Sequence, residues 1–352
     1  MSAAEDRAEN IRMIRDSAAA VAVPGDFGRI RRLRFTAPGF DRAVWRQMCG
    51  MGWAGLRVSE AEGGAGLGMG EFCALAEELG AGLVPEPLIP CAIAASVLQG
   101  TTLAALLAGD RVIIPAWQER ANSLEPAADT TFRDGRLFGK KMFVHMAAGA
   151  DAFLVSAREG FAVVERDAPR LLVAIEPTQD GGHFGVLRMS DTPATPVPGR
   201  IGAALDEAAL ATAAYLLGVM RRAFAMTLDY LKTRRQFGRP IGSFQALQHR
   251  AADLQIQIEL TRASVESAAA TLDTCTAPML RAAAVSRAKA RAADASLLVT
   301  RQAIQLHGGI GYTDEYDAGL FLRKAMVLAN LYGSAALHRA RYAATAAEDD
   351  EA

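Results

Sequence analysis

Two stretches in the second half of the chain combine residues that could bind a phosphorylated, planar ligand. Residues 230–248 read YLKTRRQFGRPIGSFQALQ, in which adjacent arginines precede an aromatic residue in a short turn. Guanidinium groups bind pyrophosphate through charge-assisted hydrogen bonds, and aromatic rings stack on a purine. Residues 305–316 read QLHGGIGYTDEY, in which adjacent glycines allow close approach of a phosphate and a glutamine adds an amide donor. Each stretch alone is also compatible with an ordinary connection between two helices.

Other kinds of chemistry find little support in the residue patterns. The five histidines are far apart and none has the HExxH spacing of a metal site. They are His145, His183, His249, His307 and His338. No GxSxG nucleophile motif occurs. The glycine cluster at 63–70 lacks the spacing of a dinucleotide-binding loop, so we predict a tight loop before a helix. We therefore predict no bound metal.

Composition narrows the class of protein. The 352 residues include 38 basic and 39 acidic ones, so the net charge of −1 gives no general attraction to nucleic acid or to an anionic membrane. A hydrophobic content of 51% excludes a disordered chain. The charged first twenty residues do not resemble a signal peptide. Cys49, Cys73, Cys91 and Cys275 lack CxxC spacing and are expected to be packing residues. We expect a cytoplasmic protein.

The elements that must position the two stretches change type twice along the chain. Residues 1–110 carry helical periodicity, as in the buried stripe predicted for Phe72, Leu75, Ala76 and Leu79. Residues 111–200 contain short runs rich in β-branched and aromatic residues, with a hairpin signal at Asp134-Gly135. We expect a β-domain of sandwich or barrel type there, ending in a proline-containing extended linker. Residues 201–352 are again helical.

The last part predicts an antiparallel four-helix bundle. Long Ala- and Leu-rich segments lie at about 205–233, 243–272, 277–307 and 316–346, separated by short Gly- or Pro-containing breaks. The predicted class is therefore α+β multidomain, mainly α, with an N-terminal helical domain, a middle β-domain and a C-terminal bundle.

In this order within a bundle, the two stretches resemble the acyl-CoA dehydrogenase family. Further resemblance lies in WRQMCGMGWAGLRVSEAEGGAGLG, EELGAGLVPEPL and GKKMFVHMAAGADAFLVSA, so it covers nearly the whole chain. The resemblance implies FAD as cofactor, α,β-dehydrogenation of an acyl-CoA thioester, and electron transfer to an electron-transfer flavoprotein. It also implies that the ADP half of FAD is held by a neighbouring subunit. The matching residues here are Arg234, Phe237, Phe244, Gln245, Gln305, Gly308 and Gly309.

The flavin-ring half of the site departs from the family pattern. The resemblance places Phe143, Val144 and His145 where the family has Trp-Ile-Thr on a strand, and PAWQERANSLEP, with Glu119, where it has a Thr-Glu-Pro loop. The Phe143 ring is smaller than the Trp ring of the family, and the His145 imidazole replaces the Thr hydroxyl that contacts the flavin in the family. Phe143, His145 and, in the later Gly-Ser pair, Ser334 are the expected cofactor contacts on this side.

The catalytic base of the family is also missing from its usual place. Tyr332, in LYGS, stands at the position of the family's Glu, and Arg235 stands at the alternative base position of a minority of members. A phenol with a pKa of about 10 is ionised about 0.1% of the time at pH 7, so ionising it to act as a base costs roughly 4 kcal/mol. The resemblance further places Ala336 at an FAD-contacting Gln and Ala209 at a substrate-contacting Arg.

With these departures, the sequence resembles one subunit of the α2β2 members of the family. In these members one chain carries the base and the flavin pocket, and the other, which this sequence resembles, completes the FAD site. We expect a base-lacking subunit of a heteromeric dehydrogenase that associates with a second family-like chain, although a homo-oligomer stays open. The alternatives are a self-sufficient dehydrogenase with a relocated base, a flavin-dependent monooxygenase of the same fold, and a non-catalytic homologue.

Overall fold

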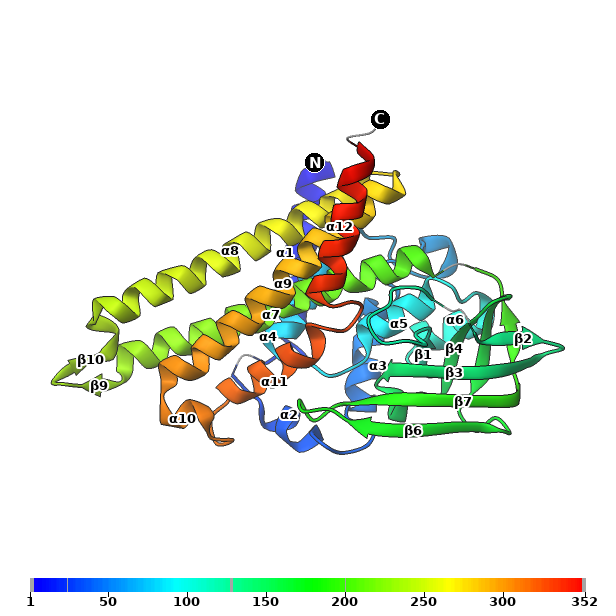
Figure 1. Cartoon of the computed structure of the whole chain (residues 1–352), viewed down its shortest axis with the longest axis horizontal. Helices are drawn as coiled ribbons and strands as arrows, with labels where there is room; N and C mark the ends of the chain where they lie inside the picture. The colour runs from blue at the N-terminus through cyan, green and yellow to red at the C-terminus, as the bar shows by residue number, and fades with distance from the viewer. Residues whose placement is uncertain (1–2, 24, 127–128, 200, 350–352) are drawn as a thin grey trace. The chain divides into compact units, whose positions relative to one another are not determined.

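The computed structural model describes residues 3–23, 25–126, 129–199 and 201–349 (Figure 1). The chain divides into two compact units, and each unit is made of segments that are not consecutive in the sequence. The first unit contains residues up to Phe27, Met69–Val84, and Ala209 onward; the second contains Gly28–Gly68 and Pro85–Ala208. The three-part division at 110 and 200 stays a prediction.

The first unit is helical. Its short N-terminal members are α1 (Ala3–Ala18) and α4 (Met69–Ala81). Its long members are α7 (Gly202–Thr233), which enters this unit at Ala209, α8 (Gln245–Thr274) and α9 (Pro278–His307). The chain then forms α10 (Gly309–Tyr312), α11 (Ala318–Leu328) and α12 (Ala335–Asp349). The first three predicted bundle helices are therefore confirmed to within a few residues.

The fourth predicted bundle helix, 316–346, is wrong as a single element. The chain leaves the helical path after α11 because Tyr332 and Gly333 have φ angles of 55° and 106°, both outside the helical region. A loop at 329–334 therefore separates α11 from α12. This loop contains the position that the sequence assigns to the family's base.

The bundle core forms between α7, α8 and α9. Phe224 on α7, Ile258 on α8 and Val299 on α9 belong to one buried apolar cluster. Two glycines allow α4 and α7 to approach closely, since a Cβ on Gly218 would lie 1.8 Å from the Glu77 carbonyl oxygen and one on Gly80 would lie 2.0 Å from that of Tyr215. The apolar window of α7 could span a membrane by length and composition, but 83% of it is buried, which is typical of a core helix.

The N-terminal stripe predicted for α4 is confirmed, since its four apolar residues are all at most 3% exposed. Asp273, from the end of α8, accepts hydrogen bonds from the backbone N–H groups of Met69 (2.6 Å) and Gly70 (3.3 Å) at the start of α4. It also pairs with Arg7 of α1. A carboxylate at this place satisfies N–H groups that have no partner inside the helix.

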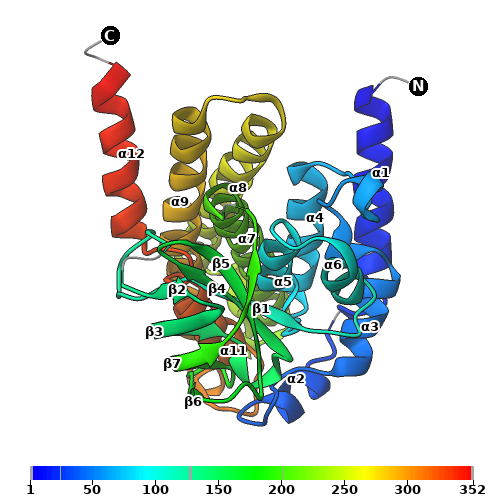
Figure 2. The same ribbon diagram turned by 90° about the vertical axis from the view of Figure 1, so that its right-hand side faces the viewer.

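The second unit holds two four-stranded sheets with short helices. Its helices are α2 (Gly28–Leu33), α3 (Arg42–Gly50), α5 (Leu88–Ala95) and α6 (Gly100–Leu107). One sheet has the order β1 (Ile113–Ala116), β4 (Ala152–Ala157), β5 (Gly160–Glu165), β8 (Thr195–Val197), in which β1 and β4 are parallel. Figure 2 shows α5 beside β1 in this unit.

The other sheet is antiparallel. Its order is β2 (Thr131–Arg133), β3 (Arg136–His145), β7 (His183–Pro193), β6 (Leu171–Pro177). The predicted Asp134-Gly135 hairpin is confirmed: it joins β2 and β3, and its two residues have φ angles of 51° and 72°, as in a type I′ turn. The proline-rich linker is only partly extended coil, because 195–197 pair with β5 as an edge strand, where proline is tolerated.

Candidate functional site

The first predicted ligand-binding stretch forms a hairpin between α7 and α8. Its strands are β9 (Arg235–Gln236) and β10 (Arg239–Pro240). Phe237 and Gly238 form the tip, with φ angles of 53° and 78°. Arg234 is fixed at the base, since its N–H donates to the Tyr230 carbonyl and its carbonyl accepts from Ile241, both at 2.8 Å.

An aromatic ring stands in solvent at the hairpin tip. Phe237 is 90% exposed and meets the Phe244 ring edge-on, with centroids 6.1 Å apart. The Arg239 guanidinium lies 4.2 Å from the Phe244 ring centroid. A bulky residue in the left-handed region costs about 1–2 kcal/mol, and such strain concentrates where ligands are held. An exposed aromatic ring on a strained backbone, next to guanidinium groups, can bind a planar, anionic ligand.

The second predicted stretch follows the end of α9. Gly308 has a φ of 66°, which favours glycine, and a Cβ added at Gly308 or at Gly309 would meet no atom within 4 Å. The backbone here is therefore open to an approaching group. Gln305, one turn earlier on α9, is exposed, as is Gln245 in the first turn of α8.

Three aromatic side chains bring the two stretches together. The ring of Tyr230, before the hairpin, lies 4.6 Å from that of His307 and 6.3 Å from that of Tyr316. The His307 Nε2 and Tyr316 Oη atoms are 3.0 Å apart. The hairpin and α10 thus lie at the same end of α7, α8 and α9 (Figure 1). We call the predicted residues around this contact the bundle-end site: Arg234, Phe237, Phe244, Gln245, Gln305, Gly308 and Gly309.

The charge of the bundle-end site is positive. Arg235 and Arg239 are exposed, and Arg235 donates to the Gly238 carbonyl in the hairpin turn at 3.1 Å. Within the described ranges, no hydrogen bond or ion pair engages the Arg234 guanidinium. This arrangement can bind a phosphate by charge-assisted hydrogen bonds, while Phe237 offers a stacking face.

The predicted base position lies in the 329–334 loop. Tyr332 is 3% exposed, and its carbonyl oxygen lies 2.9 Å from Nε2 of His338. Ser334, expected to contact the cofactor, accepts a hydrogen bond from the Leu337 N–H at 3.3 Å and so caps α12. Ala336 is exposed and Ala209 is buried in α7. The loop therefore offers a packed phenol where the family resemblance expects a carboxylate.

The predicted flavin-ring strand is β3, in the second unit. Phe143 has a φ of 53°, and the register of β3 on β7 shifts between Lys141 and Val144. The Phe143 and His145 rings both face the Phe184 ring, at centroid distances of 6.1 and 5.7 Å. The strand irregularity thus gathers three rings, and the cofactor contacts assigned to Phe143 and His145 stay predictions.

Glu119, in the remodelled loop, has a structural role. Its carboxylate accepts from Lys141 Nζ at 2.7 Å and from the backbone N–H groups of Asp129 (2.8 Å) and Thr130 (2.9 Å). Burial alone would raise the pKa of Glu119, but these hydrogen bonds lower it to about 2. Burial lowers the pKa of Lys141 to about 8. A carboxylate held in this way is a poor proton acceptor near neutral pH.

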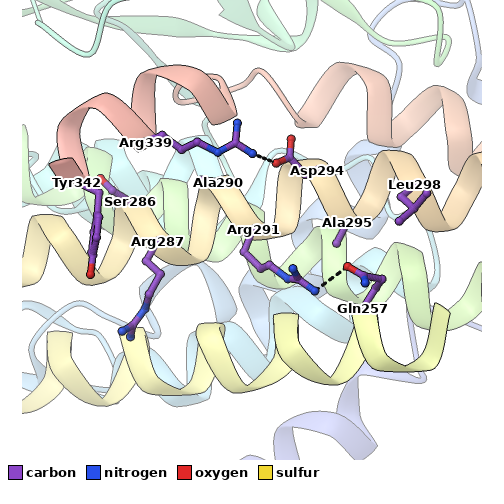
Figure 3. A pocket seen from close by; sticks show the side chains of 10 residues that line it. All are labelled: Gln257, Ser286, Arg287, Ala290, Arg291, Asp294, Ala295, Leu298, Arg339 and Tyr342. Atoms are coloured by element: carbon purple, nitrogen blue, oxygen red, sulfur yellow. Dashed lines mark hydrogen bonds and ion pairs between the residues drawn. The ribbon is translucent and has the colours of Figure 1, made fainter. Parts of the chain in front are cut away.

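A surface groove of about 380 Å³ lies between α8, α9 and α12 (Figure 3). None of the predicted site residues lines it. Its arginines are engaged with their neighbours: Arg291 donates to Gln257 at 2.7 Å, and Arg339 pairs with Asp294. The groove is therefore separate from the bundle-end site.

Comparisons with known proteins agree with this architecture. Residues 8–104 match the family model of the acyl-CoA dehydrogenase N-terminal domain, and residues 199–347 match that of the C-terminal domain. Acyl-CoA dehydrogenase IpdE2 of Mycobacterium tuberculosis is 33% identical over 93% of this chain and 94% of its own length.

Two solved structures are similar over almost the full length. The Tcur3481-Tcur3483 steroid ACAD, solved as a point variant, has 31% identity, complete coverage of both chains and a TM-score of 0.88. The ChsE4-ChsE5 complex from Mycobacterium tuberculosis has 25% identity, covers 99% of this chain and 98% of that chain, and has a TM-score of 0.84. Together with the two matched domains, these similarities establish that the chain belongs to the acyl-CoA dehydrogenase family.

Proposed function

We propose that this chain is the base-lacking subunit of a heteromeric, FAD-dependent acyl-CoA dehydrogenase. The observation that carries the proposal is the pairing of an open bundle-end site with a closed base position. Phe237 is 90% exposed, whereas Tyr332, at the base position, is 3% exposed. The chain is equipped to hold part of a cofactor but not to remove an α-proton.

The bundle-end site fits the ADP half of FAD. Arg234 would bind the pyrophosphate, Phe237 would stack on the adenine, and Gln305 with the open backbone at Gly308 and Gly309 would donate hydrogen bonds. When bound, FAD supplies the hydride acceptor for dehydrogenation. The residues of this chain anchor it at the end remote from that chemistry.

The proton side of the reaction is assigned to the partner. Removal of an α-proton requires a base with a pKa near the working pH. Tyr332 is a buried phenol, Arg235 is a cation, and Glu119 is held as a carboxylate by Lys141. We therefore assign the base to a second acyl-CoA dehydrogenase-like subunit, and the acyl-CoA and the electron-transfer flavoprotein to the assembled enzyme.

Exposed apolar side chains on the bundle support such a partner. They belong to different elements of the first unit and are 43–90% exposed: Phe237, Ile256, Leu260, Leu298, Ile310 and Tyr312. Burial of such residues in a subunit interface is favourable. The Tcur3481-Tcur3483 and ChsE4-ChsE5 similarities are both to proteins named as pairs.

The expected cytoplasmic location belongs to the same proposal. All four cysteines are free thiols, and Cys49, Cys73 and Cys91 are buried. Buried free thiols are stable in a reducing compartment.

Flavin content tests the proposal directly. The chain is purified alone and then co-expressed with a longer family member, encoded nearby, that retains the Glu. We expect the visible flavin spectrum and acyl-CoA turnover only in the co-expressed complex. Stoichiometric FAD with turnover in the chain alone would contradict it, and so would a complex without flavin.

A further inference from the structure

A buried lysine contacts the loop that carries Tyr332. Lys289, on α9, is 0% exposed. Its Nζ donates to the carbonyl oxygens of Ala329 (2.8 Å), Gly333 (3.0 Å) and Leu328 (3.3 Å). An ammonium has three N–H donors, so these contacts use all of them. Within the described ranges, Lys289 forms no ion pair with a carboxylate.

Two of these carbonyls, those of Leu328 and Ala329, lie at the C-terminal end of α11, and that of Leu328 also accepts from the Leu331 N–H at 3.3 Å. Leu328 ends α11, and the last carbonyls of a helix have no partner inside it. The same end of a helix carries partial negative charge, which favours a cation. Burial lowers the pKa of Lys289 to about 7. Carbonyl oxygens that accept from the ammonium favour its charged form.

A second buried side chain holds the next carbonyl. His338, on α12, is 0% exposed, and its Nε2 lies 2.9 Å from the Tyr332 carbonyl oxygen. A carbonyl only accepts, so Nε2 must carry the proton. In the neutral ring, Nδ1 then accepts from Ser286 Oγ, 3.2 Å away. Ser286 and Lys289 are three residues apart and lie on one face of α9.

The held backbone is strained. Tyr332 has a φ of 55°, which costs a residue with a side chain about 1–2 kcal/mol. Strained conformations persist when surrounding contacts determine them. The carbonyls of Leu328, Ala329, Tyr332 and Gly333 are all held, so the loop has little freedom to relax.

We propose that Lys289 and His338 are positioning residues that lock the 329–334 loop and keep the Tyr332 ring packed in the base position. This inference rests on the proposed function, in which the base position of this chain is closed and has a structural role. Ser286 acts one step further away, by fixing the His338 ring.

The test removes the ammonium and then returns it. Lys289→Ala leaves space for the missing three carbons and nitrogen, which propylammonium supplies. Hydrogen exchange of the full-length chain is followed by mass spectrometry. Amides of the loop should exchange about tenfold faster or more in the variant, because local opening becomes less costly. Saturating propylammonium should restore most of the protection, whereas 1-propanol, which is uncharged and has one donor, should not.

Lys141→Ala is the matched control, because Lys141 is also 0% exposed and also has three acceptors, Glu119, Ser156 and the Trp117 carbonyl, but lies in the second unit. It should leave exchange of the loop unchanged. If Lys289→Ala does not fold, Ser286→Ala, which removes one hydroxyl, should still raise loop exchange by about threefold or more. Tetranitromethane should nitrate Tyr332 in either variant and leave it unmodified in the wild type.

Unchanged loop exchange would overturn the inference. Exchange that rises equally in α8, α9 and the loop would also overturn it, as would rescue by 1-propanol to the same extent. None of these measurements involves flavin or turnover. Failure of the loop assignment is therefore distinguishable from failure of the proposed function.

Discussion

Replacing Arg234 with alanine should separate cofactor binding from folding. Among the described residues, the partners of Arg234 are Tyr230 and Ile241, and both contact its backbone, so truncation of its side chain leaves the hairpin intact. A hydrogen bond to a charged group contributes about 1.5–3 kcal/mol. Because the arginine is exposed, we take the lower end, which corresponds to about a tenfold loss of FAD affinity.

The assay is FAD titration of the assembled oligomer after flavin removal, with Tm measured in parallel. Arg239→Ala should reduce FAD affinity less than Arg234→Ala does, since the Arg239 guanidinium already lies against the Phe244 ring, 4.2 Å from its centroid. Arg46→Ala, an exposed arginine on α3, should change neither quantity. Equal FAD affinity in Arg234→Ala and wild type would refute the assignment of the bundle-end site.

The remaining predictions concern the tip, the loop and the remodelled β-domain. Phe237→Ala should weaken FAD binding by about 1–3 kcal/mol, the value of a stacking contact, with Tm unchanged because the ring is 90% exposed; a lower Tm would indicate a packing role. Tyr332→Glu should lower Tm more than the neutral Tyr332→Gln, since a buried carboxylate is costly, and should give no turnover with an artificial acceptor; turnover would show a usable flavin site in this chain. The pKa of Glu119 is lowered from 4.5 to about 2, so its contribution to the free energy of unfolding is present above pH 4.5 and is lost as the pH falls towards 2. In denaturation measured over a series of pH values, Glu119→Gln should therefore lose less stability on acidification than the wild type. Identical pH profiles would count against the Lys141 pair.

Sequence patterns located the long helices well because their apolar residues repeat with helical period over many turns. They could not locate the break after α11, since Lys289, which holds the loop, is 40 residues from Ala329 in sequence, and the contact of His338 with the Tyr332 carbonyl forms only where the chain has already left the helix. Strand β7 carries no clear strand pattern in the sequence, although it has 11 residues and pairs with both β3 and β6. Its run HFGVLRMSDTP mixes glycine, charge and turn formers, so its strand character comes from the neighbours that it pairs with.

The two stretches of the bundle-end site stand out in the sequence because the residues of each lie close together in the chain, and their role in binding FAD stays a prediction. Their proximity could not be derived from spacing alone, since it depends on the contact of Tyr230 with His307 and Tyr316. The sequence indicated Glu119 as part of a remodelled loop but did not indicate its partner. Lys141 lies 22 residues further along the chain, on β3, and reaches Glu119 only in the folded protein. Long-range ion pairs of this kind leave no periodic pattern.

Anaerobic addition of an acyl-CoA to the wild-type protein in the presence of FAD tests the central claim most directly. The chain alone, supplied with FAD, and the complex with its Glu-bearing partner are compared by flavin absorbance. We predict rapid bleaching in the complex and none in the chain alone, because Tyr332 and Arg235 cannot accept the α-proton. Rapid bleaching in the chain alone would show that it contains its own base, and the heteromeric assignment would lose its main support.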